Sequence, residues 1–233
     1  MHSNSLGYGL KNFWRRHVKT LKIAIVAALI CGYWGCAGTP APVASEDFYK
    51  VGAKTPLFNG EDLEYWEKTY YYNGDVAVKD SVLYLEKGAY LSGLTWQGPL
   101  IRMNYEIELD AMRTEGHDFF VGLTVPYGSS YFSLILGGWG GRVMGISSVD
   151  DWDASENETA DWYPFENNEW YHVRLRVVPD SIKAWLDGRN IVNLCTVDRK
   201  ISIRLDIEES LPMGIATCWT SAAYKNFYLT RLK

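Results

Sequence analysis

Hydrophobic and polar residues alternate with a period of two along much of the chain. In residues 102–111, Tyr105, Ile107 and Leu109 fall on one side of an extended strand, and acidic residues fall on the other. Residues 171–178 repeat the pattern. This period predicts antiparallel strands with one buried and one solvated face. Residues 119–123 and 132–136 are more uniformly apolar, which predicts central strands.

Turn signals separate these segments, and no stretch shows sustained helical periodicity. Asn59-Gly60 and Asp187-Gly188 are two of the turn sequences, and the second predicts a hairpin between residues 182–186 and 191–194. About a dozen short strands at this spacing predict an all-β fold, a two-sheet antiparallel β-sandwich of jelly-roll type. The further strands we expect lie at residues 57–63, 76–78, 82–85, 201–205, 213–219 and 224–229.

The first residues of the chain have the pattern of an export signal. A run of Lys and Arg precedes the apolar stretch Ile23–Ile30, which is too short to span a bilayer comfortably. Gly35-Cys36 then follows at a distance that resembles a bacterial lipoprotein signal, in which cleavage leaves Cys36 as the lipidated N-terminus. We therefore expect a signal segment at 1–36, a flexible tether at 37–52 and a folded domain at 53–233.

This pattern predicts an exported protein of the bacterial cell envelope, either periplasmic or an outer-membrane lipoprotein. An uncleaved N-terminal anchor is the alternative way of reaching the membrane. The folded part keeps two cysteines, Cys195 and Cys218. In an oxidising compartment they could form one disulfide, and two free buried thiols are the other reading.

Composition narrows the class of partner. The net charge of -5 and the lack of a Lys/Arg block after the signal segment argue against a nucleic acid. Aromatic residues make up 15% of the chain, with 10 Trp and 16 Tyr. This content suits carbohydrate recognition as well as the packing of strands.

Residues 131–159 carry the densest candidate chemistry. An apolar strand reaches the turn Gly137-Gly138-Trp139-Gly140-Gly141, a second strand follows, and the segment ends in a loop rich in carboxylates. Loops at strand ends often carry function. We take three residues of this region and one that follows it as candidates for sugar binding: Trp139, Arg142, Trp152 and Trp162.

The acidic loop has four readings. Asp150, Asp151 and Asp153 could bind calcium through carboxylate oxygens, although their spacing is not that of an EF-hand. A second reading is acid/base catalysis. The third is sugar binding, with carboxylates bonded to hydroxyls, and the fourth is a solvated acidic loop. The candidates for acid/base work are Asp151, Asp153, Glu156 and His117, with Asp118 as an orienting partner of His117.

Two further sets of residues have both a structural and a functional reading. Glu106, Glu108 and Asp110 form a polar stripe on one strand, which is either a solvated face or part of a binding groove. Trp219 and Tyr224, near the end of the chain, either face the same groove or fill the core.

Several short motifs together resemble the 3-keto-disaccharide hydrolase domain family, formerly a domain of unknown function. Leu57 to Leu63 (LFNGEDL) with Trp66 is similar to the family's opening, and Asn168-Glu169-Trp170 to its G-E-W-N region. The hairpin at 184–188 and the closing strands around 214–216 and 224–227 follow in the family's order, so the likeness spans roughly residues 55–232.

The resemblance implies a concanavalin-A-like jelly roll on a secreted or surface-anchored bacterial protein that acts on carbohydrate. The family's Glu- and Asp-bearing central segment is not recognisable, and residues 137–159 stand in its place. Our leading hypothesis is an exported domain that hydrolyses or eliminates a (3-keto-)glycoside. The alternatives are a non-catalytic carbohydrate-binding module and a structural protein of the cell surface.

Overall fold

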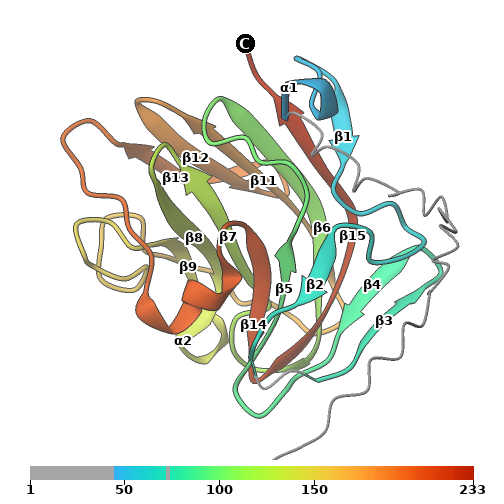
Figure 1. The fold of residues 1–233 in the computed structure, drawn as a ribbon. Helices are drawn as coiled ribbons and strands as arrows, with labels where there is room; N and C mark the ends of the chain where they lie inside the picture. The colour runs from blue at the N-terminus through green and yellow to red at the C-terminus, as the bar shows by residue number, and fades with distance from the viewer. Residues whose placement is uncertain (1–44, 72–73) are drawn as a thin grey trace, which may run out of the picture. The chain divides into compact units, whose positions relative to one another are not determined.

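The computed structural model describes residues 45–71 and 74–233 (Figure 1). The predicted signal segment, its Cys36 and the first part of the tether lie outside the described residues. Within the two described ranges, no helix is long and apolar enough to cross a membrane.

The described strands form two antiparallel sheets that stack as two layers (Figure 1). The eight-stranded sheet has the order β13 (Arg189–Cys195), β12 (Ser181–Leu186), β11 (Trp170–Val178), β6 (Tyr105–Gly116), β15 (Thr220–Arg231), β4 (Val82–Leu85) and β3 (Val76–Lys79), with β1 (Lys54–Pro56) also on β15. The seven-stranded sheet has the order β10 (Asp161–Trp162), β9 (Val143–Ser147), β8 (Ser130–Gly137), β7 (Val121–Tyr127), β14 (Gly214–Cys218), β5 (Leu91–Trp96) and β2 (Trp66–Lys68). The predicted all-β jelly-roll sandwich is confirmed.

The core lies between the two sheets. On β6, Tyr105, Ile107 and Leu109 are fully buried in it, as the period of two predicts. Val121 and Leu123 of β7 belong to the same cluster from the opposite sheet. Because strand side chains alternate, the residues between these positions face outward from each sheet.

The described residues also form three short helical turns: α1 (Ser45–Phe48) before the first strand, α2 (Gly138–Gly141) and the 3-10 helix η1 (Leu205–Ser210). The turn α2 joins β8 to β9 at the glycine-rich sequence, where a turn is predicted. Gly137 precedes it with a φ of 83°, in the left-handed region that favours glycine.

The expected edge strand at residues 57–63 is not formed. The side chain of Asn59 accepts hydrogen bonds from the backbone amides of Glu61 and Asp62, at 2.8 and 3.0 Å. These local bonds stabilise a turn, which competes with strand pairing. The edge strand of this region is instead β1, which pairs with β15.

The expected strand at residues 201–205 is also absent. Ile201 forms a single bridge with Val149, and η1 begins at Leu205. A strand would put Leu205 on the same face as Ile201, but Leu205 is 83% exposed and Ile207 is buried in its place. The short helical turn therefore exposes Leu205 and buries Ile207, which an extended strand would place on one face.

The folded domain begins earlier than residue 53. Tyr49 is fully buried, and its hydroxyl donates a 3.0 Å hydrogen bond to the carbonyl of Pro99. Val51 bridges to Arg231 at the end of β15. The last residues of the expected tether are therefore part of the domain, because an aromatic side chain there fills the core.

Candidate functional site: a pocket on the seven-stranded sheet

A cavity of about 190 Å³ lies on the outer face of the seven-stranded sheet. Ser133 and Ile135 of β8 line it, whereas Phe132 and Leu134, which alternate with them, belong to the core. Gly122 on the neighbouring β7 leaves room for the ring of Phe119, another lining residue, because a Cβ there would lie 2.9 Å from that ring. Small residues on this face thus make space for a pocket.

One side of the pocket, the polar corner, consists of Ser133, Ser147, Arg204 and Asp206. Ser133 and Ser147 are register partners across β8 and β9. The Arg204 guanidinium donates to both carboxylate oxygens of Asp206, Nε to Oδ1 at 3.0 Å and Nη2 to Oδ2 at 3.2 Å. Hydrogen bonding to Asp206 raises the pKa of Arg204, so this corner carries a permanent cation.

Asp153 lies behind the polar corner and links two of its members. It forms a salt bridge with Arg204, and its Oδ1 accepts a 3.1 Å hydrogen bond from the hydroxyl of Ser147. Asp153 is not itself a lining residue of the pocket. It therefore orients the groups that face the ligand space.

Asp118 and Trp139 lie at the end of the pocket formed by the start of β7 and the turn α2. The Asp118 carboxylate accepts hydrogen bonds from the backbone amides of Phe119, at 2.8 Å, and Gly140, at 3.2 Å. Within residues 45–71 and 74–233, Asp118 forms no salt bridge. The pocket thus holds one oriented carboxylate without a cationic partner there.

Tyr90, Leu91, Cys218 and Trp219 also line the pocket, and the 3-10 helix η1, which carries Asp206, contacts the strands β5 and β14 of Leu91 and Cys218. The rings of Tyr90 and Trp219 meet edge to face, with centroids 5.3 Å apart. Burial raises the pKa of the Cys218 thiol to about 12, with further contributions from the charges of Asp118 and Asp206. A thiol in such surroundings stays neutral.

Trp139 and Trp219 are unusual in both exposure and backbone. They are 45% and 49% exposed, and their φ angles are 48° and 45°. A bulky residue in the left-handed region stores strain, which typically persists where a side chain has a function. Two such tryptophans at one pocket favour a binding role for both.

A buried arginine supports the turn that carries Trp139. Arg113 is 6% exposed, and burial lowers its pKa. Its guanidinium donates to the side chain of Asn167 at 2.6 Å, to the carbonyl of Gly141 at 3.4 Å and to the carbonyl of Phe165. These bonds tie α2 to the loop at Phe165 and Asn167.

The structure separates the predicted site residues. Trp139 lines the pocket, and Asp153 contacts it from behind. The other candidates are exposed and do not line the pocket: His117, Arg142, Asp151, Trp152, Glu156 and Trp162. Of the two late aromatic residues, Trp219 lines the pocket and Tyr224 is buried in the core.

The predicted calcium ligands do not converge. Asp150 pairs with Arg199, Asp151 with Lys200 and Asp153 with Arg204. In the described part of the chain, no group of three or more His, Cys, Asp or Glu residues could hold a metal ion. The carboxylates are neutralised by these cations from residues 199–204, which the spacing of the acids does not reveal.

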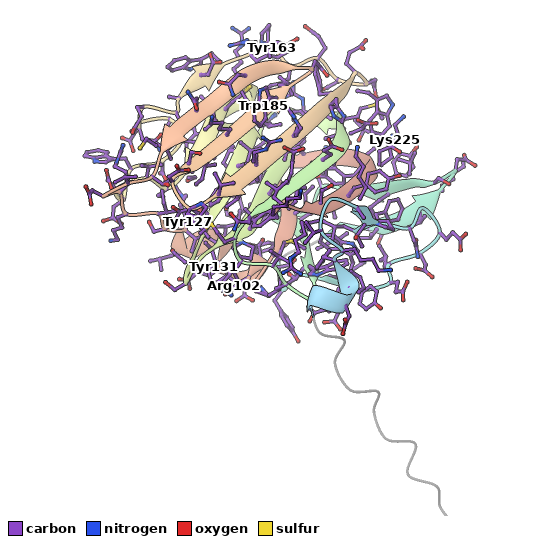
Figure 2. The ribbon with its side chains drawn as sticks, turned by 90° about the horizontal axis from the view of Figure 1, so that it is seen from above. Arg102, Tyr127, Tyr131, Tyr163, Trp185 and Lys225 are labelled. Carbon is purple, nitrogen blue, oxygen red and sulfur yellow. The ribbon has the colours of Figure 1, made fainter. Side chains whose placement is uncertain are left out.

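The polar stripe of β6 lies on the outer face of the eight-stranded sheet. Two of its acids form ion pairs, Glu106 with Arg174 and Arg176 and Glu108 with Lys54, and Asp110 forms a 2.8 Å hydrogen bond with the His172 ring. Figure 2 looks onto this face, with Trp185 over its strands. Arg174 stacks on the Trp185 ring at 3.9 Å. This face is a solvated network of paired charges, away from the pocket.

Sequence reasoning did not select Tyr90, Arg204 or Asp206, and Asp118 was considered only as a partner of His117. These residues come from three separate segments that the fold brings together: Tyr90, Asp118, and Arg204 with Asp206. Arg204 and Leu205 fall in the strand predicted at 201–205, whereas Asp206 lies in the helical turn η1, which the sequence pattern does not predict. The two cysteines are both free, with Cys218 buried in the pocket and Cys195 exposed.

The comparisons with known proteins agree with this architecture. The sequence profile of the 3-keto-alpha-glucoside-1,2-lyase-like domain matches residues 53–230, which is most of the chain. The chain belongs to this family. The resemblance carried by the short motifs is thereby confirmed, and no curated protein matches the chain.

Solved structures share the fold at low sequence identity. A Crh5 transglycosylase in complex with NAG is 10% identical with a TM-score of 0.52, covering 77% of this chain and 83% of that chain. A structure from work on endo-acting O-glycanases of human gut bacteria is 12% identical with a TM-score of 0.50, covering 79% and 100%. The carbohydrate-binding module CBM66 from Bacillus subtilis is 14% identical with a TM-score of 0.47, covering 71% and 95%. The first two of these structures share the fold of this chain.

Proposed function

We propose that the pocket binds a glycoside of a 3-keto sugar and cleaves it by elimination. The observation that carries this proposal is the oriented Asp118 carboxylate in the same pocket as Trp139 and the Arg204 cation. The family description, a 3-keto-alpha-glucoside-1,2-lyase-like domain, supports the same substrate class. Trp139 offers an exposed ring for stacking on the sugar.

The chemistry follows from the ketone. A carbonyl at C3 acidifies the hydrogen on C2, and Asp118 acts as the base that takes this proton. The electron pair of the broken C–H bond passes to the ketone oxygen as an enolate. When the carbonyl re-forms, a double bond joins C1 and C2 and the bond from C1 to the glycosidic oxygen breaks. The leaving oxygen takes up the proton that Asp118 removed from C2, which restores the carboxylate.

Arg204 stabilises the enolate oxygen in this scheme. Its bonds to Asp153 and Asp206 use three of its five N–H groups, which leaves two donors for a ligand. A preorganised cation near the developing negative charge is usually the largest single contribution to lowering the barrier of such a step. The two carboxylates that hold Arg204 keep its guanidinium in one orientation.

The test is incubation of the protein with 3-keto-glycosides and with the ordinary glycosides of the same sugars. We expect turnover of the keto compounds, and a loss of at least about 100-fold in kcat/KM for Asp118→Asn, the usual size of a general-base contribution. Asp151→Asn and Glu156→Gln, which alter exposed acids outside the pocket, are the matched controls. Full activity of Asp118→Asn would refute its role as the base.

A carbohydrate-binding module is the second candidate function. It is favoured by the pairing of Arg204 with Asp153 and Asp206, because these two carboxylates neutralise the positive charge that would stabilise the enolate. In that case the keto-glycosides bind, Trp139→Ala weakens binding, and no substrate is turned over. A structural surface protein, the third candidate, would show neither binding nor turnover.

The proposal includes export to the bacterial cell envelope and attachment to a membrane through lipidated Cys36. The basic and apolar N-terminal segment and the Gly35-Cys36 pair support it. Fractionation of cells that express the wild type or Cys36→Ser tests the anchor. Release of the variant into the soluble fraction supports lipidation, and retention in the membrane indicates an uncleaved anchor instead.

A further inference from the structure

Tyr90 lines the pocket with a hydroxyl that has no hydrogen-bond partner among residues 45–71 and 74–233. The other hydroxyl groups of the lining are already bonded, Ser133 to Thr124 at 2.8 Å and Ser147 to Asp153 at 3.1 Å. The Tyr90 side chain is half-buried at the ligand space. Its hydroxyl is therefore a proton donor that the proposed elimination does not use.

Trp219 holds Tyr90 in one orientation. The backbone amide of Trp219 donates to the carbonyl of Tyr90 at 2.9 Å, and its indole N–H donates to the carbonyl of Ala89 at 3.0 Å. The rings of Tyr90 and Trp219 also meet edge to face. The left-handed backbone of Trp219 thus places a tryptophan where it fixes both the main chain and the ring of Tyr90.

The Asp118 carboxylate and the Tyr90 hydroxyl come from the same edge of the seven-stranded sheet. Asp118 precedes β7, Trp219 follows β14 and Tyr90 precedes β5, and β14 pairs antiparallel with both neighbours. The amide of Cys218 donates to the carbonyl of Phe119 at 3.1 Å, which connects these strand ends. Two strand spacings, about 10 Å, separate the backbones of Asp118 and Tyr90. A ligand in the pocket can therefore contact both side chains.

We infer that Tyr90 relays the proton of the elimination from Asp118 to the leaving glycosidic oxygen. The inference rests on the proposed function, in which Asp118 takes the proton from C2. As the bond from C1 to the glycosidic oxygen breaks, the O–H bond of Tyr90 breaks and its proton passes to that oxygen. The tyrosinate then takes the C2 proton from Asp118, so both residues return to their starting states and no other reactant is needed.

The electrostatics of the pocket suit this role. Burial raises the pKa of Tyr90, and the charges of Asp206 and Asp118 act in the same direction. The hydroxyl is therefore protonated at neutral pH, as a proton donor must be. Arg204 acts in the opposite direction, so its cation stabilises the transient tyrosinate. The competing donor is the thiol of Cys218, which is buried and, as a thiol, donates weakly.

The experiment compares Tyr90→Phe with the wild type on two 3-keto-glucosides, one carrying a second glucose and one carrying 4-nitrophenol. Nitrophenol is far more acidic than a sugar hydroxyl, so it departs as an anion without a proton donor. For the disaccharide we expect kcat/KM to fall about 100-fold or more, and for the nitrophenyl compound less than about threefold. In D₂O the variant should still exchange the C2 hydrogen of the disaccharide, because Asp118 acts before the leaving group departs.

Two further variants serve as controls. Tyr65→Phe is the matched control, since Tyr65 is 38% exposed outside the pocket and Tyr90 is 40% exposed within it. We expect it to preserve both rates. Tyr90→Phe keeps the ring that packs on Trp219, so the fold is preserved. A loss confined to the disaccharide in Cys218→Ala, but not in Tyr90→Phe, would assign the relay to the thiol and overturn the inference.

The wild-type rates separate the inference from the proposed function. Absence of turnover of either keto-glucoside by the wild type would overturn the elimination and the relay together. Wild-type turnover, with no loss or an equal loss on both compounds in Tyr90→Phe, would overturn the relay alone. Loss of C2 exchange in Tyr90→Phe would also overturn it, because the tyrosine would then be needed before the leaving group departs.

Discussion

Asn157 holds the acidic loop against β9, and its replacement tests how much these bonds contribute to the stability of the domain. Its side chain is 9% exposed. The amide nitrogen donates to the carbonyls of Ile146 at 2.8 Å, Trp152 at 3.0 Å and Asp153 at 2.8 Å. The amide oxygen accepts from the backbone N–H of Thr159 at 2.9 Å and from its hydroxyl at 2.6 Å.

Asn157→Asp preserves the size of the side chain but replaces the donor NH₂ with an acceptor. Two N–H groups that serve three carbonyls are lost, and an oxygen then faces those carbonyls. At about 1 kcal/mol for each buried hydrogen bond, we expect a loss of roughly 2–3 kcal/mol in the free energy of unfolding. For a domain of this size this lowers Tm by roughly 4–12 °C.

Urea unfolding, followed by tryptophan fluorescence and by circular dichroism, measures the change. A lower midpoint with an unchanged m value shows that stability alone has changed. Asn193→Asp, at an exposed asparagine on β13, is the control for the added charge. If Asn157→Asp costs less than about 0.5 kcal/mol, a value typical of surface substitutions, the hydrogen-bond argument is wrong.

Three other predictions concern the charges and thiols. Asp153→Asn removes the ion pair that orients Arg204, so we expect kcat/KM or affinity for the ligand to fall about tenfold at nearly unchanged Tm, whereas the exposed Asp151→Asn changes neither. The backbone amide of Lys200 and the Arg199 guanidinium lower the pKa of Asp150, and Arg199 also lowers the pKa of Glu158. The stability that these bonds contribute is therefore present at a pH above the pKa of an unfolded carboxyl group. It is lost as the pH falls through the lower pKa of the folded state. The Tm difference between wild type and Arg199→Gln should therefore shrink on acidification, and a constant difference would refute the pairing. Iodoacetamide at pH 8, read by peptide mass spectrometry, should label the exposed Cys195 faster than the buried Cys218, whose pKa is raised to about 12; equal rates would contradict this burial.

Several elements could be predicted from local pattern alone. The alternation at 102–111 and 171–178 predicts which side chains of β6 and β11 enter the core, and it is confirmed. Asp187-Gly188 predicts the turn between β12 and β13. Such signals depend on residues that are near in sequence, so they predict these elements even when the neighbouring strands are unknown.

The acidic loop shows where local pattern is insufficient. Its carboxylates crowd a short stretch, which suggested a metal site or a catalytic centre. Their partners are Arg199, Lys200 and Arg204, some fifty residues further along the chain. Charge density in the sequence could not distinguish an unpaired cluster from one neutralised by a distant segment.

The sequence by itself determined the fold class, the buried faces of its strands and the family, because hydrophobic periodicity and turn residues act over short distances. The tertiary structure alone decided the pocket. The pocket brings together Asp118, Trp139, Arg204 and Trp219. These residues meet because β7, β8 and β14 are adjacent in the sheet, and because η1, which follows Arg204, contacts β14. That adjacency arises from pairing between distant strands, so the site depends on contacts that no single stretch of the sequence contains.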